Sequence, residues 1–328
     1  MQDNFPIEWR PTASLENLRL RARVLAAIRS FFSERGVLEV ETPTLSSTTV
    51  TDPHLHSFTT RYTGPGAPQG RTLCLQTSPE FAMKRLLAAG SGPIYQLGKV
   101  FRNEEAGRRH NPEFTLLEWY RPEFDLAALM SEVEALVGLL IGAPQAERLS
   151  YADAFVRHVG INPHAATVEE LKHCALIQNI SEPPGLDDSG RDGWLDLLLT
   201  HVVEPQLGIG RPTFIFDYPP SQAALARVRP GNPAVAERFE LYISGIELAN
   251  GYHELGDAGE QRRRFDADRA KRHAAGLPDI LPDERLLAAL QHGLPDCCGV
   301  ALGVDRLLMI AAQAQTIDEV MAFPVSRV

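Results

Sequence analysis

Cysteine is scarce in this chain, and the cysteines present show no spacing typical of a metal or redox site. They are Cys74, Cys174, Cys297 and Cys298, and the adjacent pair is not a C-x-x-C motif. Zinc binding and dithiol redox chemistry are therefore disfavoured. We expect reduced, partly buried thiols.

Long apolar runs are also missing. Residues 1–10 contain no apolar signal-peptide core. The longest apolar stretch, near Leu136–Ile141, is far shorter than the roughly 20 residues that a membrane-spanning helix needs. We therefore expect a cytoplasmic protein without a membrane span.

The chain has no basic surplus, because its net charge is −10. Proteins that grip a long nucleic acid usually present a basic face, so the charge balance argues against tRNA as a partner. The 328 residues are 44% hydrophobic and 23% charged, which is typical of a soluble globular enzyme with one large domain or two small ones.

The N-terminal part predicts a helix followed by a strand. Ser14 can cap a helix that runs to Arg35, and Gly36 can end it. Apolar residues repeat at helical spacing along this segment, from Leu18 to Phe32. Residues 37–41 then read as a strand that ends at a Thr-Pro pair.

Residues 98–121 hold the most informative pattern. Two strands, expected at about 94–102 and 113–120, flank a loop of alternating charges that suits no hydrophobic core. Its cationic or nearly cationic side chains are Arg102, Arg108, Arg109 and His110, and its carboxylates are Glu104, Glu105, Glu113 and Glu118. Such a loop on a rigid hairpin favours the binding of a polyphosphate with its cation.

Further elements are expected on both sides of this hairpin. Ser78 can cap a helix that has Pro79 at its first position. Helices are predicted at about 125–142 and 167–178, with a loop at 181–193. Glu240 and Glu247 lie on predicted strands that meet at a tight Ser-Gly turn, so both can face one site. The basic run at 262–264 favours a solvated helix face over a nucleic-acid site.

The C-terminal segment predicts a strand at 298–302, a break at Gly303 and a helix at 304–312. Gly303 would let a planar base approach the backbone. Arg306 falls in the first turn of the helix, where a cation is unfavourable unless an anion or a ring lies nearby.

Together these segments resemble the class II aminoacyl-tRNA synthetases, specifically the lysyl branch. Phe-Arg-Asn-Glu at 101–104 and Arg-His-Asn-Pro-Glu-Phe at 109–114 resemble motif 2, placed at about 94–121. Residues 14–43 resemble motif 1, and 298–313, with Gly-Val-Asp-Arg at 303–306, resemble motif 3. The resemblance implies an α+β fold, with an antiparallel sheet flanked by helices and a helical insertion at about 125–200. It also implies one catalytic domain over 1–328 and a homodimer built on motif 1.

The resemblance assigns nucleotide roles. Arg102 would bridge the substrate carboxylate and the α-phosphate, and Arg102 and Arg306 would be the catalytic residues. Glu104 would bind the adenine amino group, and Phe114 and Arg306 would sandwich the ring. The remaining ATP residues would be Asn103, Arg109, His110, Asn111, Glu247, Leu248 and Gly303. Glu240 and Glu247 would hold Mg²⁺ on the ATP.

Leftover carboxylates point to a substrate with two amino groups. Glu118 and Tyr120 are two residues apart on a strand and share a face. By resemblance, Tyr120 and Glu254 would bind the distal ammonium, and Ser78-Pro79-Glu80 the nearer amino group. The pocket would be completed by Glu118, Asn250 and Ala301, where lysyl enzymes tend to have glycine. Lysine or a lysine isomer is thus expected.

Full lysyl-tRNA synthetases also carry an N-terminal anticodon-reading domain, for which no room is expected before residue 14. The whole chain resembles the stand-alone paralogues that adenylate (R)-β-lysine and transfer it to the ε-amine of a lysine on translation elongation factor P. Alternatives are a minimal enzyme that aminoacylates tRNA or a tRNA-like acceptor, a non-catalytic amino-acid sensor, and a carrier-protein ligase. The retained Arg102, Glu240, Glu247 and Arg306 disfavour the sensor.

Overall fold

The computed structural model describes residues 8–183, 185–186 and 190–328. The expectation about a signal core in residues 1–7, and part of the predicted loop at 181–193, lie outside the described residues. The chain divides into two compact units. The first unit comprises Met1–Glu118, Asp257–Gly293 and Gly303–Val328, and the second comprises Trp119–Gly256 and Leu294–Leu302. Their boundary falls within strands β6 and β12, so each strand runs from one unit into the other.

The first unit begins with helix α1 (Leu15–Glu34), which forms as predicted. Ser14 accepts a hydrogen bond from the Asn17 amide, and Gly36 follows the helix with a φ of 64°. The predicted strand at 37–41 is shorter, because only Leu38–Glu39 (β1) pairs, in parallel, with β5 (Ile94–Phe101). Strand β5 is followed by β6 (Glu113–Pro122) in the sheet order.

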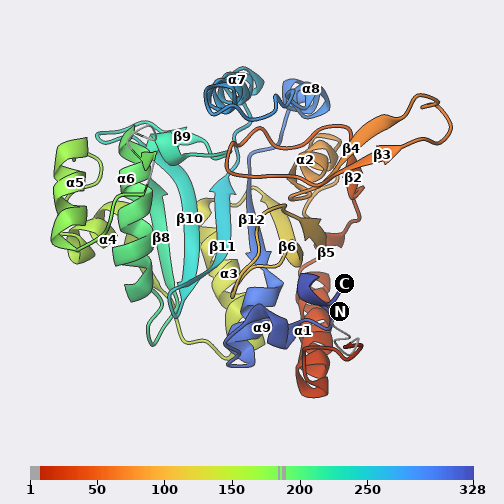
Figure 1. Cartoon of the computed structure of the whole chain (residues 1–328), viewed down its shortest axis with the longest axis horizontal. Coiled ribbons are helices and arrows are strands. Elements are labelled where there is room, and N and C mark those ends of the chain that lie inside the picture. Colours follow the sequence, from red (N-terminus) through yellow and green to blue (C-terminus); the bar gives the residue numbers. More distant parts are fainter. Residues whose placement is uncertain (1–7, 184, 187–189) are drawn as a thin grey trace, which may run out of the picture. The chain divides into compact units, whose positions relative to one another are not determined.

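A small antiparallel sheet with the order β2-β4-β3 precedes helix α2. Its strands are Leu45–Ser46 (β2), Thr59–Tyr62 (β3) and Arg71–Leu75 (β4). Helix α2 (Glu80–Ala88) starts one residue later than predicted, with Pro79 at the cap. It packs against α8 (Glu284–His292), which lies beside α7 (Ala258–Ala274) in Figure 1. Helix α9 (Val304–Ala311) follows β12 (Cys297–Gly303), as predicted.

The second unit is organised on a largely antiparallel sheet. Its strand order is β6-β12-β11-β10-β8-β7, with β9 (Val228–Arg229) on β10. The remaining strands are β7 (Glu147–Ser150), β8 (Thr213–Tyr218), β10 (Val235–Ile243) and β11 (Ile246–His253). The turn between β10 and β11 is the predicted one, since Ser244 and Gly245 both have positive φ values, 53° and 66°, as short hairpin turns require.

Helices complete the second unit. They are α3 (Leu126–Ile141), α4 (Tyr151–His158), α5 (Val168–Ile177) and α6 (Gly190–Leu198), followed by a π-helical turn (Leu199–Val203). Short 3-10 turns occupy Glu204–Gln206 and Pro220–Gln222 here, and Ile317–Val320 and Val325–Arg327 in the first unit. Helices α4, α5 and α6 gather beside β8 in Figure 1.

A further helix boundary also differs from the prediction. Helix α6 begins at Gly190, so residues 190–193, expected in the loop, are helical. The apolar side chains of Trp194 and Leu195 are buried in the core that also holds Tyr151 and Phe155, and this packing overrides the local glycines. Strand β7 and helices α4 and α8 are also additional to the predicted elements. Among the described residues, none of the helices combines the length and the hydropathy of a membrane-spanning segment.

Candidate active site

The charged loop between β5 and β6 is held by backbone bonds that fix Arg102. The Arg102 amide donates to the Pro112 carbonyl at 2.9 Å, and the Asn103 amide donates to the His56 carbonyl at 2.7 Å. Glu104 adopts a left-handed φ of 71°. The Arg102 guanidinium lies 5.1 Å from the centre of the Phe114 ring, so a cation and an aromatic face approach each other in a cation–π contact.

Arg306 of α9 reaches the same loop within the first unit. Its Nη2 lies 2.5 Å from Nε2 of His110, and its Nε donates to the Arg109 carbonyl at 3.5 Å. Burial, followed by the positive charge of Arg306, lowers the pKa of His110 below its ordinary value of 6.5. A neutral imidazole can accept a hydrogen bond from Arg306. The structure thus brings together Arg306, Arg109 and His110, three of the residues predicted to bind ATP.

Asn111, predicted to contact the nucleotide, is engaged by the backbone. Its side chain is buried at 5% exposure. The amide nitrogen donates to the Glu113 carbonyl at 2.6 Å, and the oxygen accepts from the Val325 amide at 2.8 Å. In this arrangement Asn111 shapes the loop rather than offering its amide to a ligand.

An ion pair that sequence reasoning missed joins all three sequence motifs inside the first unit. Asp305 is 2% exposed. It accepts from Arg21 of α1 at 2.5 Å and from the Thr115 amide of β6 at 2.6 Å. Arg21 also donates to the Thr115 hydroxyl at 2.6 Å. Spacing gives no signal for this contact, because the three residues are far apart in the chain.

Residues predicted to bind the amino acid lie at the start of α2 in the first unit. The Ser78 hydroxyl donates to Glu118 at 2.7 Å and accepts from the Glu80 amide at 3.0 Å. Glu80 accepts from Lys84 at 2.6 Å. Lys84 is 1% exposed, and its i, i+4 spacing from Glu80 was the one available signal for this pair.

In the second unit, Glu240 is buried at the centre of a polar cluster. Its Oε1 accepts from Arg238 and Asn250, and its Oε2 accepts from Tyr218 and Tyr242. Burial and the Glu240 charge raise the pKa of both tyrosines. Burial by itself would lower the pKa of Arg238. The negative charge of Glu240, together with the other neighbours, has the larger effect, so the pKa of Arg238 is raised. Tyr218, Tyr242 and Arg238 therefore stay protonated and can donate hydrogen bonds to the Glu240 carboxylate.

These contacts decide how well Mg²⁺ fits the predicted ligands. A carboxylate has about four acceptor positions, and the four donors around Glu240 use them. Glu240 therefore does not fit a direct ligand role in this arrangement. Glu247 is half-buried on β11, and its carboxylate is the kind of oxygen ligand that Mg²⁺ prefers. Among the described residues, no three His, Cys, Asp or Glu side chains form a metal-binding group.

Two predicted residues for the distal ammonium meet in the second unit. A Cβ added to Gly299 would lie within 3.0 Å of the Tyr120 ring and of Oε1 of Glu254. Only glycine at 299 leaves room for this pair. Asn250 pairs with Ala301, and Tyr252 with Gly299, in the β11–β12 register, so Ala301 lies two residues from Gly299 on the same face.

The comparisons with known proteins agree with this arrangement. The family described as class II tRNA synthetases (D, K and N) matches residues 4–327. A protein of Edwardsiella ictaluri (strain 93-146), named elongation factor P–(R)-β-lysine ligase, is 54% identical over 319 residues, covering 97% of this chain and 98% of the relative. A protein of the same name from Proteus mirabilis (strain HI4320) is 54% identical over 320 residues, covering 98% of each. The α+β class predicted from the sequence is confirmed, and the chain belongs to the class II tRNA synthetases of the D, K and N group.

Proposed function

We propose that this chain is a ligase that activates (R)-β-lysine with ATP and transfers it to the ε-amino group of a lysine on elongation factor P. The observation that carries the proposal is its 54% identity, over nearly the full length of both chains, with proteins named for this reaction. The family implies the use of ATP, and the approach of both Glu254 and Tyr120 to Gly299 suits a substrate with a distal ammonium.

In the first step, the substrate carboxylate attacks the α-phosphorus of ATP. A new P–O bond forms, the bond to the β-phosphate oxygen breaks, and pyrophosphate leaves. Arg102 would offset the negative charge that gathers when two anions react. Arg306 and Phe114 would hold the nucleotide in line for attack, since positioning supplies much of the rate in such reactions.

In the second step, the acceptor amine attacks the carbonyl carbon of the adenylate. The amide bond forms, the bond from carbonyl carbon to phosphate oxygen breaks, and AMP leaves. The acceptor lysine must lose its proton before or during attack, and solvent or the departing phosphate can take it. No side chain needs to act as a general base.

Carboxylates would select the substrate by binding its two amino groups. Glu254 and Tyr120 would bind the distal ammonium, and Ser78 and Glu80 the nearer amino group. Glu118 would orient Ser78 through their 2.7 Å hydrogen bond. Mg²⁺, when bound with ATP, would neutralise phosphate charge, and Glu247 would hold it.

Aminoacylation of tRNA is the second candidate, because the matching family is one of tRNA synthetases. The net charge of −10 opposes it. Incubation of the enzyme with ATP and radiolabelled β-lysine, together with either elongation factor P or tRNA, separates the two. Label on tRNA alone would contradict our proposal.

Assembly and location complete the proposal. A homodimer built on motif 1 would cover Leu15 and Leu38, which are 66% and 56% exposed. Sedimentation of wild type and of a Leu15→Glu variant tests this, because a charge there should favour the monomer. A cytoplasmic location suits the free cysteines.

Activation itself is tested by ATP–pyrophosphate exchange. We expect exchange with (R)-β-lysine, weaker exchange with lysine, and none with β-alanine, which lacks the distal ammonium. The Arg102→Ala variant should retain its circular dichroism spectrum and lose exchange. Equal exchange with β-alanine and β-lysine would contradict the assigned pocket.

A further inference from the structure

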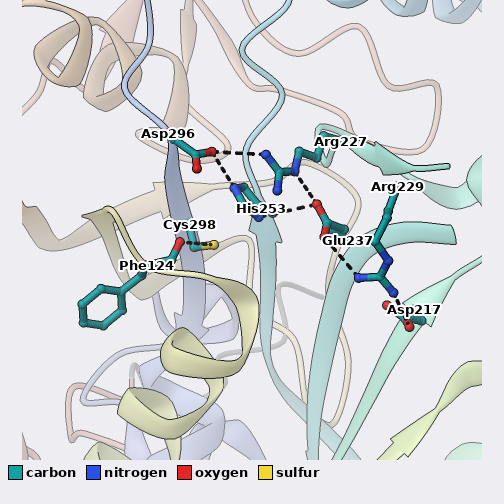
Figure 2. Close-up of polar contacts among 8 residues, drawn as sticks. All are labelled: Phe124, Asp217, Arg227, Arg229, Glu237, His253, Asp296 and Cys298. Carbon is teal, nitrogen blue, oxygen red and sulfur yellow. Dashed lines mark hydrogen bonds and ion pairs between the residues drawn. The ribbon is translucent and has the colours of Figure 1, made fainter.

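His253 belongs to a closed ring of four polar side chains in the second unit. His253 is 4% exposed. Its Nε2 lies 2.7 Å from Oδ1 of Asp296, and its Nδ1 lies 3.5 Å from Oε2 of Glu237. Arg227 contacts both carboxylates, through Nε to Glu237 and through Nη1 to Asp296 at 3.2 Å. Figure 2 shows how the four side chains close on one another.

The ring is fastened to the backbone that carries Glu254. The His253 carbonyl accepts from the Arg227 amide at 2.9 Å, and the Glu254 amide donates to the Cys297 carbonyl at 3.0 Å. Asp296 directly precedes Cys297. Successive side chains of an extended segment point to opposite sides, so Glu254 points away from the ring while its main chain is held by it.

The ring borders a cavity on one side, so polar contacts help to set the position of His253. His253, Glu237 and Arg227 line a cavity of about 310 Å³, together with Phe216 of β8 and Met130 of α3. A side chain beside such a space has few apolar neighbours on that side to fix it. The hydrogen bond from His253 also lowers the pKa of Asp296, so this carboxylate stays charged and keeps the ring closed.

We infer that His253 is a positioning residue for Glu254, and that it acts through its ring with Asp296, Arg227 and Glu237. The inference rests on the proposed function, in which Glu254 binds the distal ammonium of the amino acid. A carboxylate that selects an ammonium must be held in place before the substrate arrives, because a small displacement weakens a charged hydrogen bond. Opening the ring should therefore weaken binding of the amino acid and leave ATP binding unchanged.

The test uses substitutions that spare the core. The Asp296 side chain is 72% exposed, so Asp296→Ala opens the ring without removing buried packing. His253→Leu opens it from the other side, and His253→Gln restores an amide donor toward Asp296. The matched control is Asp217→Asn. Asp217 pairs with Arg229 at 2.7 Å, and Arg229 in turn contacts Glu237 at 3.1 Å, so this variant removes a neighbouring charge and leaves the four contacts of the ring in place. The φ of 60° at Asp217 suits asparagine.

We expect Asp296→Ala and His253→Leu to raise the KM for β-lysine about tenfold in pyrophosphate exchange, with the KM for ATP unchanged. His253→Gln should recover much of the loss, and Asp217→Asn should behave as wild type. An unchanged KM for β-lysine in both ring variants, or an equal rise in both KM values, would overturn the inference.

Hydrogen exchange of the Glu254 amide gives a second readout that needs no activity. We expect faster exchange at this amide in Asp296→Ala and no change in Asp217→Asn; equal rates in Asp296→Ala and wild type would overturn the inference. If the wild-type enzyme supports no exchange with any diamine, the proposed function fails, whereas the amide measurement still decides whether the ring positions residue 254.

Discussion

Arg21 and Asp305 form a 2.5 Å ion pair that joins α1 to the first turn of α9. The carboxylate also accepts from the Thr115 amide, so one buried group fixes three segments that are distant in the sequence. Arg306, the next residue, lies beside His110, and we expect its position to depend on this anchor. Asp305 thus links the segments predicted to be motifs 1, 2 and 3.

Asp305→Asn should destabilise the protein and misplace Arg306. Loss of one charge from a buried pair costs about 3 kcal/mol. Urea unfolding measures this cost, and the KM for ATP should rise in parallel. The control is Asp279→Asn, which breaks the exposed 2.8 Å pair with Arg269 and should cost under about 1 kcal/mol. Equal costs for the two variants would contradict the anchoring role.

Gly299→Ala should close the pocket for the distal ammonium. The new methyl group would collide with Tyr120 and Glu254, which costs about 1–3 kcal/mol when side chains must shift. The KM for β-lysine should rise more than the KM for ATP in pyrophosphate exchange. At Gly256 an added Cβ finds its nearest neighbour at 4.0 Å, so Gly256→Ala is the matched control. Retention of wild-type kinetics in Gly299→Ala would refute the pocket assignment.

Substitutions at Glu240 and Glu247 should separate folding from ion binding. Glu240→Gln leaves Arg238 without its carboxylate and should lower the free energy of unfolding by about 3 kcal/mol. Glu247→Gln should change stability by less than about 1 kcal/mol but raise the Mg²⁺ concentration needed for exchange. If instead Glu240→Gln unfolds like wild type and needs more Mg²⁺, then Glu240 is an ion ligand.

His110 should make stability depend on pH below its ordinary pKa. Because its pKa is lowered in the folded protein, the unfolded chain binds the proton first as pH falls. The His110 contribution is thus complete above pH 6.5 and is lost as pH falls from there through the folded pKa. Urea unfolding measured above and below pH 6.5 gives the change in the free energy of unfolding with pH. We expect this change to be smaller in His110→Gln than in wild type. Identical pH slopes would contradict this.

The sequence could predict the elements whose ends carry local signals. Ser14 and Gly36 bound α1, and Ser244-Gly245 set the β10–β11 turn, because capping and positive φ depend on residues close in the chain. The α6 boundary could not be predicted, since it depends on packing of Trp194 against distant side chains. Short elements such as α4 and α8 likewise give weak periodic signals.

The candidate site shows the same division. Arg102, Phe114 and Arg306 were recognisable because charge on a hairpin, and a cation at a helix start, need a ligand to explain them. Two features depend on strand register and on how loops bring distant segments together. They are the ion pair of Asp305 with Arg21 and the ring that contains His253. Sequence spacing alone could not place those partners, nor reveal the donors that surround Glu240.

Mass spectrometry of elongation factor P, after incubation with this enzyme, ATP and (R)-β-lysine, tests the central claim most directly. Our account predicts that one lysine of the acceptor gains the mass of a β-lysyl group, and that the gain disappears in Arg102→Ala and when ATP is omitted. An unmodified acceptor in the presence of active pyrophosphate exchange would contradict the account.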